Sequence, residues 1–243
     1  WVAGLTFPLF TNNAPSVYPV GTTTVTWTAT DAAGNTATCS QTVTVTDNQP
    51  PTALCQPVTV QLNASGTGST TAAAVNNGSS DACGIQSLTL SQTAFTCANV
   101  GSNTVTLTVR DVNNNTSTCS ATVTVQDLVA PVAVCQNVTV ELNASGTGST
   151  MGAAVNNGSS DACGIQSLSL SQTTFNCANV GSNTVTLTVT DVNNNTATCS
   201  ATVTVQDLVV PVAVCQNVTV QLDNTGNGST KGTAVNHGGS HAC

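Results

Sequence analysis

The sequence has little charge and few aromatic side chains. Of its 243 residues, 5% are charged and 3% are aromatic, and Lys and Arg together number 2. Nucleic acids and anionic membranes are bound through clustered basic side chains, so neither is an expected partner. A chain with so few aromatic residues also lacks the material for a large aromatic-lined ligand pocket.

Long apolar runs and helical periodicity are missing as well. No uninterrupted apolar stretch approaches the ~20 residues that a membrane helix needs, so we expect no membrane insertion. No window repeats its apolar residues with helical spacing. The sequence opens on Trp1 without the charged and then apolar pattern of a signal peptide, which suggests mature or internal sequence.

Val, Thr, Asn, Ser and Gly are abundant instead, together with 11 cysteines. The β-branched residues Val and Thr favour strands. Cysteines that recur at fixed spacing indicate disulfides formed in an oxidising compartment, whereas buried free thiols are the alternative. We therefore expect an extracellular or cell-surface protein.

The sequence repeats itself with a period of about 80 residues, which is longer than the repeats of solenoid proteins. The stretch "VNNGSSDACGIQSL" occurs at 75–88 and again at 155–168, and "NASGTGST" at 63–70 returns at 143–150. A period this long indicates a tandem array of independently folded β-sandwiches. Asp followed by Pro marks the linkers, which divides the chain into a C-terminal half-repeat, two complete repeats and an N-terminal half-repeat: 1–47, 48–127, 128–207 and 208–243.

Short alternating segments within each repeat predict strands. "VTVQL" (58–62), "NTVTLTV" (103–109) and "SATVTVQD" (120–127) place Val or Leu inward and Thr outward. Pieces rich in Gly and Asn between them predict turns. We therefore expect an all-β chain of antiparallel β-sandwiches, with about seven strands in each repeat.

Residues 18–50, "YPVGTTTVTWTATDAAGNTATCSQTVTVTDNQP", resemble the C-terminal half of a hyalin repeat, or HYR domain. The family pattern is "PVGTTTVTWTATDxxGNxxxCxxxVxVxDxxPP". Residues 48–127 and 128–207 resemble a four-cysteine variant found in long secreted bacterial surface proteins, with "NN" in place of the usual "GN". The resemblance implies tandem immunoglobulin-like sandwiches in extracellular adhesive or structural proteins, and it carries over no catalytic residues.

Immunoglobulin-like topology can place the first and last strands of a repeat side by side and parallel. That arrangement predicts the disulfides Cys55–Cys119 and Cys135–Cys199 and leaves Cys83–Cys97 and Cys163–Cys177, which close loops of about 15 residues. A competing arrangement joins Cys119 to Cys135 across a repeat boundary. The remaining cysteines are expected to pair outside this segment or between copies: Cys39, Cys215 and Cys243.

The motif "DVNNN" has the spacing of the first three ligands of a calcium loop, but it lacks the Gly and the late Glu of an EF-hand. Because the motif lies between two strands, a hairpin turn is the favoured interpretation and a calcium site is the alternative. No cofactor other than calcium is expected. The candidate ligands are Asp111, Asn113, Asn115, Asp191, Asn193 and Asn195. Asp47, Asp127 and Asp207 precede the linkers and are further candidates, with a cap or turn role preferred.

Other motifs give weaker hypotheses. "HGGSHAC", with His237 and His241, suggests a metal site, but it aligns with the repeat's "NGSSDAC" and is expected to be a structural loop. Glycosylation stays open, because a chain rich in Asn, Ser and Thr contains many Asn-x-Ser/Thr sequons by chance. The sequons include Asn63, Asn77, Asn114, Asn137, Asn143, Asn157, Asn194 and Asn217.

No catalytic set emerges, because no His recurs in the repeats to activate a Ser or Thr. The sequence predicts a non-catalytic extracellular structural or adhesive array that forms a disulfide-stapled stalk or filament. Its expected partners are neighbouring repeats or copies of itself in a fibre. The alternatives are a glycan- or calcium-binding adhesin module, and a spacer region of a secreted enzyme.

Overall fold

The structure is a computed structural model that describes residues 8–232, 238, 240, 241 and 243. The described chain is nearly all β and divides into two compact units. One unit holds the residues up to 58 with 70–93 and 103–123, and the other holds 59–69, 94–102 and the residues from 124 onward. Within the described ranges, no helix has the length and apolar character needed to cross a membrane.

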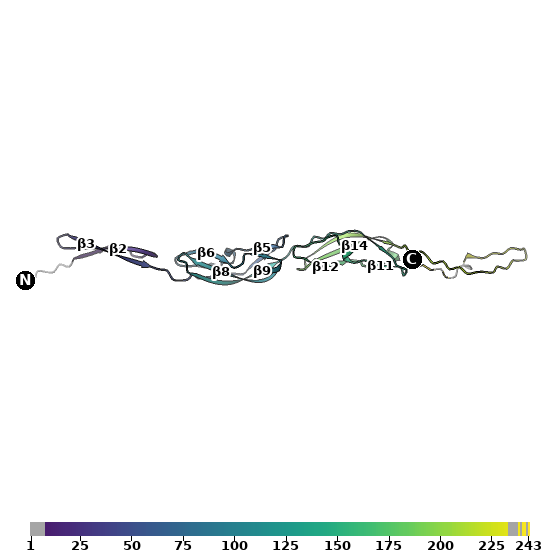
Figure 1. Cartoon of the computed structure of the whole chain (residues 1–243), viewed down its shortest axis with the longest axis horizontal. Coiled ribbons are helices and arrows are strands. Elements are labelled where there is room, and N and C mark those ends of the chain that lie inside the picture. The colour runs from purple at the N-terminus through teal and green to yellow at the C-terminus, as the bar shows by residue number, and fades with distance from the viewer. Residues whose placement is uncertain (1–7, 233–237, 239, 242) are drawn as a thin grey trace, which may run out of the picture. The chain divides into compact units, whose positions relative to one another are not determined.

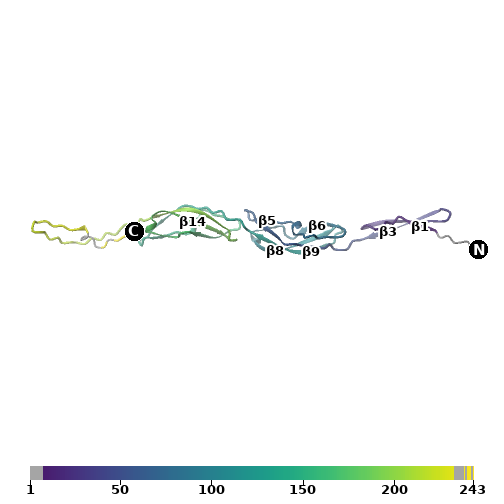
Figure 2. The ribbon, with the colours of Figure 1, turned by 180° about the vertical axis from the view of Figure 1, so that it is seen from behind.

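The repeat 128–207 lies wholly in the second unit. Its larger sheet has four strands in the order β10 (Val138–Glu141), β15 (Thr196–Gln206), β14 (Gly181–Asp191) and β12 (Ile165–Leu170). Strand β10 runs parallel to β15, and the other neighbours are antiparallel. Strands β12 and β14 are labelled in the green part of Figure 1, and β14 is labelled again, from behind, in Figure 2.

A second, smaller sheet completes this repeat. It pairs β11 (Thr147–Ser149) with β13 (Thr174–Asn176), and two short helices accompany it, α2 (Gly152–Val155) and the 3-10 helix η2 (Cys177–Asn179). Residues 128–137 contribute only isolated bridges, such as Val132 to Ser160, because Pro131 has no N–H to donate to a ladder. The repeat therefore has six strands, close to the expected number of about seven.

The core lies between the two sheets. Val185, Leu187 and Val189 of β14 are fully buried, and they alternate with Thr residues that face outward. Phe175 of the smaller sheet belongs to the same core cluster, so side chains from both sheets share one interior. This confirms the predicted β-sandwich with Val and Leu inward.

The repeat 48–127 carries the same elements at equivalent positions. They are β4 (Val58–Gln61), β5 (Thr67–Ser69), α1 (Ala72–Val75), β6 (Ile85–Leu90), β7 (Ala94–Thr96), η1 (Cys97–Asn99), β8 (Gly101–Asp111) and β9 (Thr116–Gln126). The sheet orders β4-β9-β8-β6 and β5-β7 match those of the next repeat. The recurrence confirms the predicted fold class of tandem immunoglobulin-like β-sandwiches.

The flanking segments contain parts of this pattern. Strands β1 (Leu9–Asn12), β2 (Gly21–Thr30) and β3 (Thr36–Val45) form a three-stranded antiparallel sheet, visible in purple in Figure 1. After residue 207 the described residues form no named strand. There Val220 is 39% exposed, whereas its counterpart Val140, which lies on β10 beside β15, is 6% exposed. The partner strand of a complete repeat is what buries this position.

Candidate cation site and disulfide pairs

Two disulfides close loops within single repeats. Cys55 is bonded to Cys119 and Cys135 to Cys199, each with a Cα–Cα distance of 5.9 Å and a separation of 64 residues. Because β10 and β15 run parallel, Cys135 just before β10 and Cys199 near the start of β15 lie at the same end of the sheet. These pairs agree with the topological prediction and exclude the Cys119–Cys135 alternative.

Two further disulfides join consecutive repeats. Cys97 is bonded to Cys163 and Cys177 to Cys243, each 66 residues apart, so the predicted pairs Cys83–Cys97 and Cys163–Cys177 were wrong. The two segments are packed closely together: a Cβ added to Gly66 would lie 2.6 Å from Cys97 Sγ and 3.2 Å from Ala162 Cβ. The following repeat's loop therefore lies against Cys97. The expectation for Cys243 was also wrong, since its partner is in this chain.

Three cysteines are free and exposed: Cys39, Cys83 and Cys215. The inter-repeat separation of 66 residues, counted back from Cys83, leads to position 17, where the sequence has Val17. The intra-repeat spacing would place the partners of Cys39 and Cys215 at positions outside 1–243. The pairing of these two therefore stays a prediction.

The "DVNNN" motif forms the hairpin turn between the last two strands of each repeat. Asp191 Oδ1 accepts the backbone N–H groups of Asn193 and Asn195, both at 2.8 Å, and Asp191 Oδ2 accepts Asn195 Nδ2 at 2.8 Å. Asn194 has a φ of 70°, a conformation that Asn tolerates and that Gly34, with a φ of 88°, takes in the first segment. The motif thus acts as a turn, and its Asp carboxylate is occupied by protein donors.

The matching turn in the earlier repeat is built in the same way. Asp111 is fully buried, and it accepts the backbone N–H groups of Asn113 and Asn115 and the Asn115 side-chain amide. Burial raises the pKa of Asp111, but the Asn115 side chain and the backbone N–H groups outweigh burial and leave the pKa below its usual value. The carboxylate is therefore held in its ionised form.

A pair of carboxylates lies beside each turn. Asp127, which follows β9 and is 6% exposed, has a carboxylate oxygen within 4.8 Å of one from Asp161. Asp161 Oδ1 accepts the Cys163 N–H at 2.8 Å. Asn195 Nδ2 donates to the Asp127 carbonyl at 3.2 Å, which holds the turn carrying Asn193 against Asp127.

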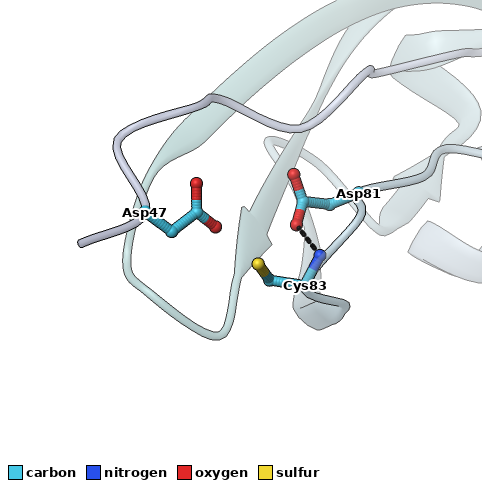
Figure 3. Close-up of side chains that lie close together, drawn as sticks. All are labelled: Asp47, Asp81 and Cys83. Atoms are coloured by element: carbon cyan, nitrogen blue, oxygen red, sulfur yellow. Dashed lines mark hydrogen bonds between the residues drawn. The ribbon is translucent and has the colours of Figure 1, made fainter. Parts of the chain in front are cut away.

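The same arrangement recurs at the preceding boundary. Asp47 and Asp81 have carboxylate oxygens within 4.8 Å of each other, and Figure 3 shows both carboxylates and the Cys83 sulfur facing a common space. Asp81 Oδ1 accepts the Cys83 N–H at 2.8 Å, and Asn115 Nδ2 donates to the Asp47 carbonyl at 3.1 Å. The sequence reasoning missed Asp81 and Asp161; their recurrence in "SSDAC" was the available signal.

Four buried side-chain oxygens in the described part of the chain have no hydrogen-bond partner: Asp47 Oδ2, Asn113 Oδ1, Asp127 Oδ2 and Asn193 Oδ1. Buried polar atoms are almost always paired, so each exception calls for an explanation. All four belong to the two arrangements just described, one Asp and one Asn in each.

The cysteine sulfurs beside the two carboxylate pairs do not offer thiolate ligands for a cation. Cys163 is bonded to Cys97 and offers no thiolate. A hydrogen bond with Asp47, followed by burial and the charges of nearby carboxylates, raises the pKa of the Cys83 thiol, so it stays protonated. The available donors are therefore oxygens alone.

The third boundary lacks the second carboxylate. His241 stands at the position that corresponds to Asp161, and its Nε2 lies 3.5 Å from Asp207 Oδ2. The same ring nitrogen contacts the Val209 carbonyl, and Nδ1 accepts the Cys243 N–H at 3.1 Å. His237 lies outside the described residues. His241 thus contacts a carboxylate where the other boundaries have a second carboxylate.

The eight asparagines named as sequon positions above are exposed. Asn137 Oδ1 also accepts the Thr202 N–H at 2.8 Å, which ties its side chain to β15. Exposure makes the eight positions accessible and does not distinguish acceptors from chance matches, so glycosylation stays a prediction.

Comparison with known proteins supports part of the sequence reasoning. The HYR domain model matches residues 3–45, which overlap the segment 18–50 that resembles a hyalin repeat. No curated protein matches the chain.

Solved structures give low similarity. A mouse clustered protocadherin structure, PcdhgC3 EC1-3, has 12% identity and a TM-score of 0.35, covering 78% of this chain and 78% of that one. A Ca2+-stabilized adhesin that helps an Antarctic bacterium bind ice has 17% identity and a TM-score of 0.25, covering 76% of this chain and 57% of that one. At these TM-scores neither structure bears on the function of this chain.

Proposed function

We propose that this chain is a non-catalytic extracellular structural or adhesive array whose repeats are joined covalently into a stiff stalk or filament. The observation that carries the proposal is the Cys97–Cys163 disulfide, which connects residues of two consecutive repeats. The HYR match at residues 3–45, the all-β fold and four disulfides support an extracellular module of this kind.

The two junctions crossed by such a disulfide then have two covalent connections each. Repeats joined by a single linker are expected to move relative to one another unless their interface is large. Here the linker around Pro131 is one connection, and Cys97–Cys163 is a second that leaves from a different part of the repeat. Two separate connections restrict bending and rotation about the junction, which suits a protein that must keep its length.

The finer assignments belong to the same proposal. We assign segment boundaries at 1–47, 48–127, 128–207 and 208–243 and identify the complete repeats with the four-cysteine HYR variant. The partners are neighbouring repeats or copies of the chain in a fibre. Glycan binding is less favoured, because only 3% of the residues are aromatic and sugars are commonly held on aromatic platforms.

Cleavage of one linker tests the covalent junction. A protease site inserted between Leu128 and Pro131 separates the two complete repeats in the backbone. After cleavage the fragments should migrate together on a non-reducing gel and apart after reduction, because only Cys97–Cys163 crosses the cut. In C97S/C163S they should separate without reductant. Two separate bands from the oxidised parent chain would refute the junction.

The stiffness is tested separately by small-angle scattering on the uncut chain. We expect C97S/C163S to show a broader distribution of interatomic distances than the parent chain, while C83S, which removes a free thiol, should not. Equal distributions in all three proteins would contradict the role assigned to the disulfide.

A further inference from the structure

We infer that Asp127, Asp161 and Asn193 bind a calcium ion, and that Asp47, Asp81 and Asn113 bind a second one in the equivalent place. The inference starts from Asp127, which is 6% exposed and has an Oδ2 atom without any partner. A buried carboxylate oxygen without a donor is costly, and a bound cation removes that cost. The turn that carries the other orphaned oxygen, Asn193 Oδ1, is held against Asp127 by Asn195.

The local charge points the same way. Asp127 and Asp161 place two carboxylates within 4.8 Å of each other, as do Asp47 and Asp81. Among the residues that the structure describes, none of these four carboxylates forms an ion pair. The sequence has only 2 basic residues, and one of them, Arg110, donates to Asn114. Neighbouring carboxylates repel each other when both are ionised, so a divalent cation stabilises the pair.

The donor set selects calcium. Calcium prefers oxygen ligands at about 2.3–2.6 Å, so two ligands of one ion lie at most about 5 Å apart. The carboxylate oxygens, within 4.8 Å of each other, meet that condition. Magnesium demands near-ideal octahedral geometry and gives up its water ligands reluctantly, so an all-protein site of this kind suits it less well. Two carboxylates and an amide oxygen, completed by water, make a calcium shell without sulfur.

An ion at this place would connect three segments of the chain. Asp127 follows β9 in the linker, Asp161 lies in the loop before β12, and Asn193 lies in the β14–β15 turn. The ion would therefore hold the linker onto the loop and the turn of the following repeat. This inference is independent of the disulfide junction, because Asp161 and Asn193 could bind calcium whether or not Cys97–Cys163 stiffens the array.

The third boundary supplies an internal contrast. His241 replaces the second carboxylate, and its Nε2 lies 3.5 Å from Asp207 Oδ2. A ring nitrogen in this position occupies the carboxylate that a cation would need. We therefore expect two calcium ions per chain, one at each Asp–Asp boundary.

Calorimetry and thermal unfolding of the oxidised full chain, first stripped with EDTA, test the inference. Titration with CaCl2 should give about two ions per chain with a Kd of roughly 0.1–1 mM, in the range of extracellular calcium modules. About 5 mM CaCl2 should raise the Tm by a few degrees, because the ion binds the folded state only. MgCl2 at the same concentration should give a smaller shift.

Variants locate the sites. D161N should bind one ion and D81N/D161N none, and D161H, which copies the third boundary, should behave as D161N. The control is E141Q, which removes the same charge from an exposed position where the other repeats carry Gln61 and Gln221, and it should still bind two ions. Peptide mapping of Cys97–Cys163 checks folding, since an Asn at 161 can still accept the Cys163 N–H.

A second variant covers the case in which D161N loses that disulfide. N193A removes the amide oxygen and leaves the backbone bonds to Asp191 in place, so it should weaken one site about tenfold or more. The inference is overturned if the parent chain binds no calcium at about 10 mM, well above the Kd range of such modules. It is also overturned if D81N/D161N still binds two ions, or if E141Q loses as much binding as D161N.

Discussion

Cys97 lies in the short helix η1 of one repeat, and its disulfide partner Cys163 lies in the following repeat, 66 residues later. The Cys177–Cys243 bond has the same separation, which makes this an inter-repeat rule. Applied to Cys83, the rule places a partner at position 17, where Val17 is 79% exposed. Cys83 is therefore a free thiol because its partner position holds Val.

The substitution Val17→Cys should create a third inter-repeat disulfide with Cys83. In the repeat alignment position 17 corresponds to Cys97, and Cys83 corresponds to Cys163. The two thiols should therefore meet as that pair does, with its Cα–Cα distance of 5.2 Å. The chain has three free thiols, and V17C should have two although it has one more cysteine. Thiol titration in denaturant measures the number.

Val17→Ser is the matched control and should keep three free thiols. Peptide mapping should find the 17–83 peptide in V17C alone. Four free thiols in oxidised V17C would show that the spacing rule does not extend to this segment.

The disulfides show how far the sequence could be interpreted. Cys55–Cys119 followed from strand order, because parallel first and last strands bring their starts together. Cys97–Cys163 could not be predicted in this way. Cys83 and Cys163 are equivalent positions of two repeats, one shortly before Cys97 and one far after it, and the sequence alone does not favour either as its partner. Choosing between the two requires knowing that Gly66 and Ala162 pack around Cys97, which is a contact between distant segments.

Gly148 marks a close approach between the two sheets. A Cβ at this position would lie 2.6 Å from Val140 Cγ1 and 3.0 Å from the Glu141 carbonyl. The second contact is with backbone and cannot be relieved by a rotamer change. G148A should therefore lower the free energy of unfolding of this repeat by about 1–3 kcal/mol, as overpacking does. Denaturant unfolding followed by hydrogen exchange in β14 and β15 measures the loss.

Gly232→Ala is the control for this prediction, because a Cβ added to Gly232 would have no atom within 4 Å. The same methyl group is added at an open position, and the change in unfolding free energy should stay within about 0.5 kcal/mol. Equal destabilisation by G148A and G232A would mean that the sheet contact is not specific to Gly148.

Asp111 should make the repeat 48–127 sensitive to acid. Burial raises the pKa of Asp111, but the donors from Asn115 and the turn backbone outweigh burial, so the folded pKa lies below 3.8. A lowered folded pKa contributes stability that is present above the unfolded value and is lost as the pH falls through the folded pKa. We expect this contribution to stay constant from pH 7 to about 5 and to decrease below about pH 4.

Carboxyl chemical shifts followed by NMR give the pKa of Asp111 directly. The variant D111N should be less stable than the parent chain at pH 7 and should show a flatter dependence below pH 4. A measured pKa at or above 3.8 would contradict the assignment of the turn donors as the dominant influence.

The turn could be predicted more completely than the cation site. The spacing in "DVNNN" identified Asp191 and Asn195 through local chemistry, since a turn uses residues close in sequence. The carboxylate group combines Asp127 with Asp161, which are distant in the sequence and meet only through the fold. Asp127 and Asn193, which carry the unpaired oxygens, were both calcium candidates from the sequence, whereas Asp161 was not predicted.

Cys39 and Cys215 should form an intermolecular disulfide in concentrated, oxidising solution. They correspond to Cys199 and Cys135, which are bonded in the complete repeat. Leu222 is 68% exposed, whereas its counterpart Leu142 in the complete repeat is 4% exposed. The segment after 207 therefore has exposed apolar side chains, and strand β3 of another copy, the counterpart of β15, would cover them.

A non-reducing gel should show a ladder of head-to-tail multimers, with the 39–215 peptide as its link. C39S and C215S should each abolish that ladder, whereas C83S should keep it because Cys83 has no part in the pairing. A ladder that survives in C39S, or links found only between two Cys215 residues, would rule out completion of one copy's half-repeat by another.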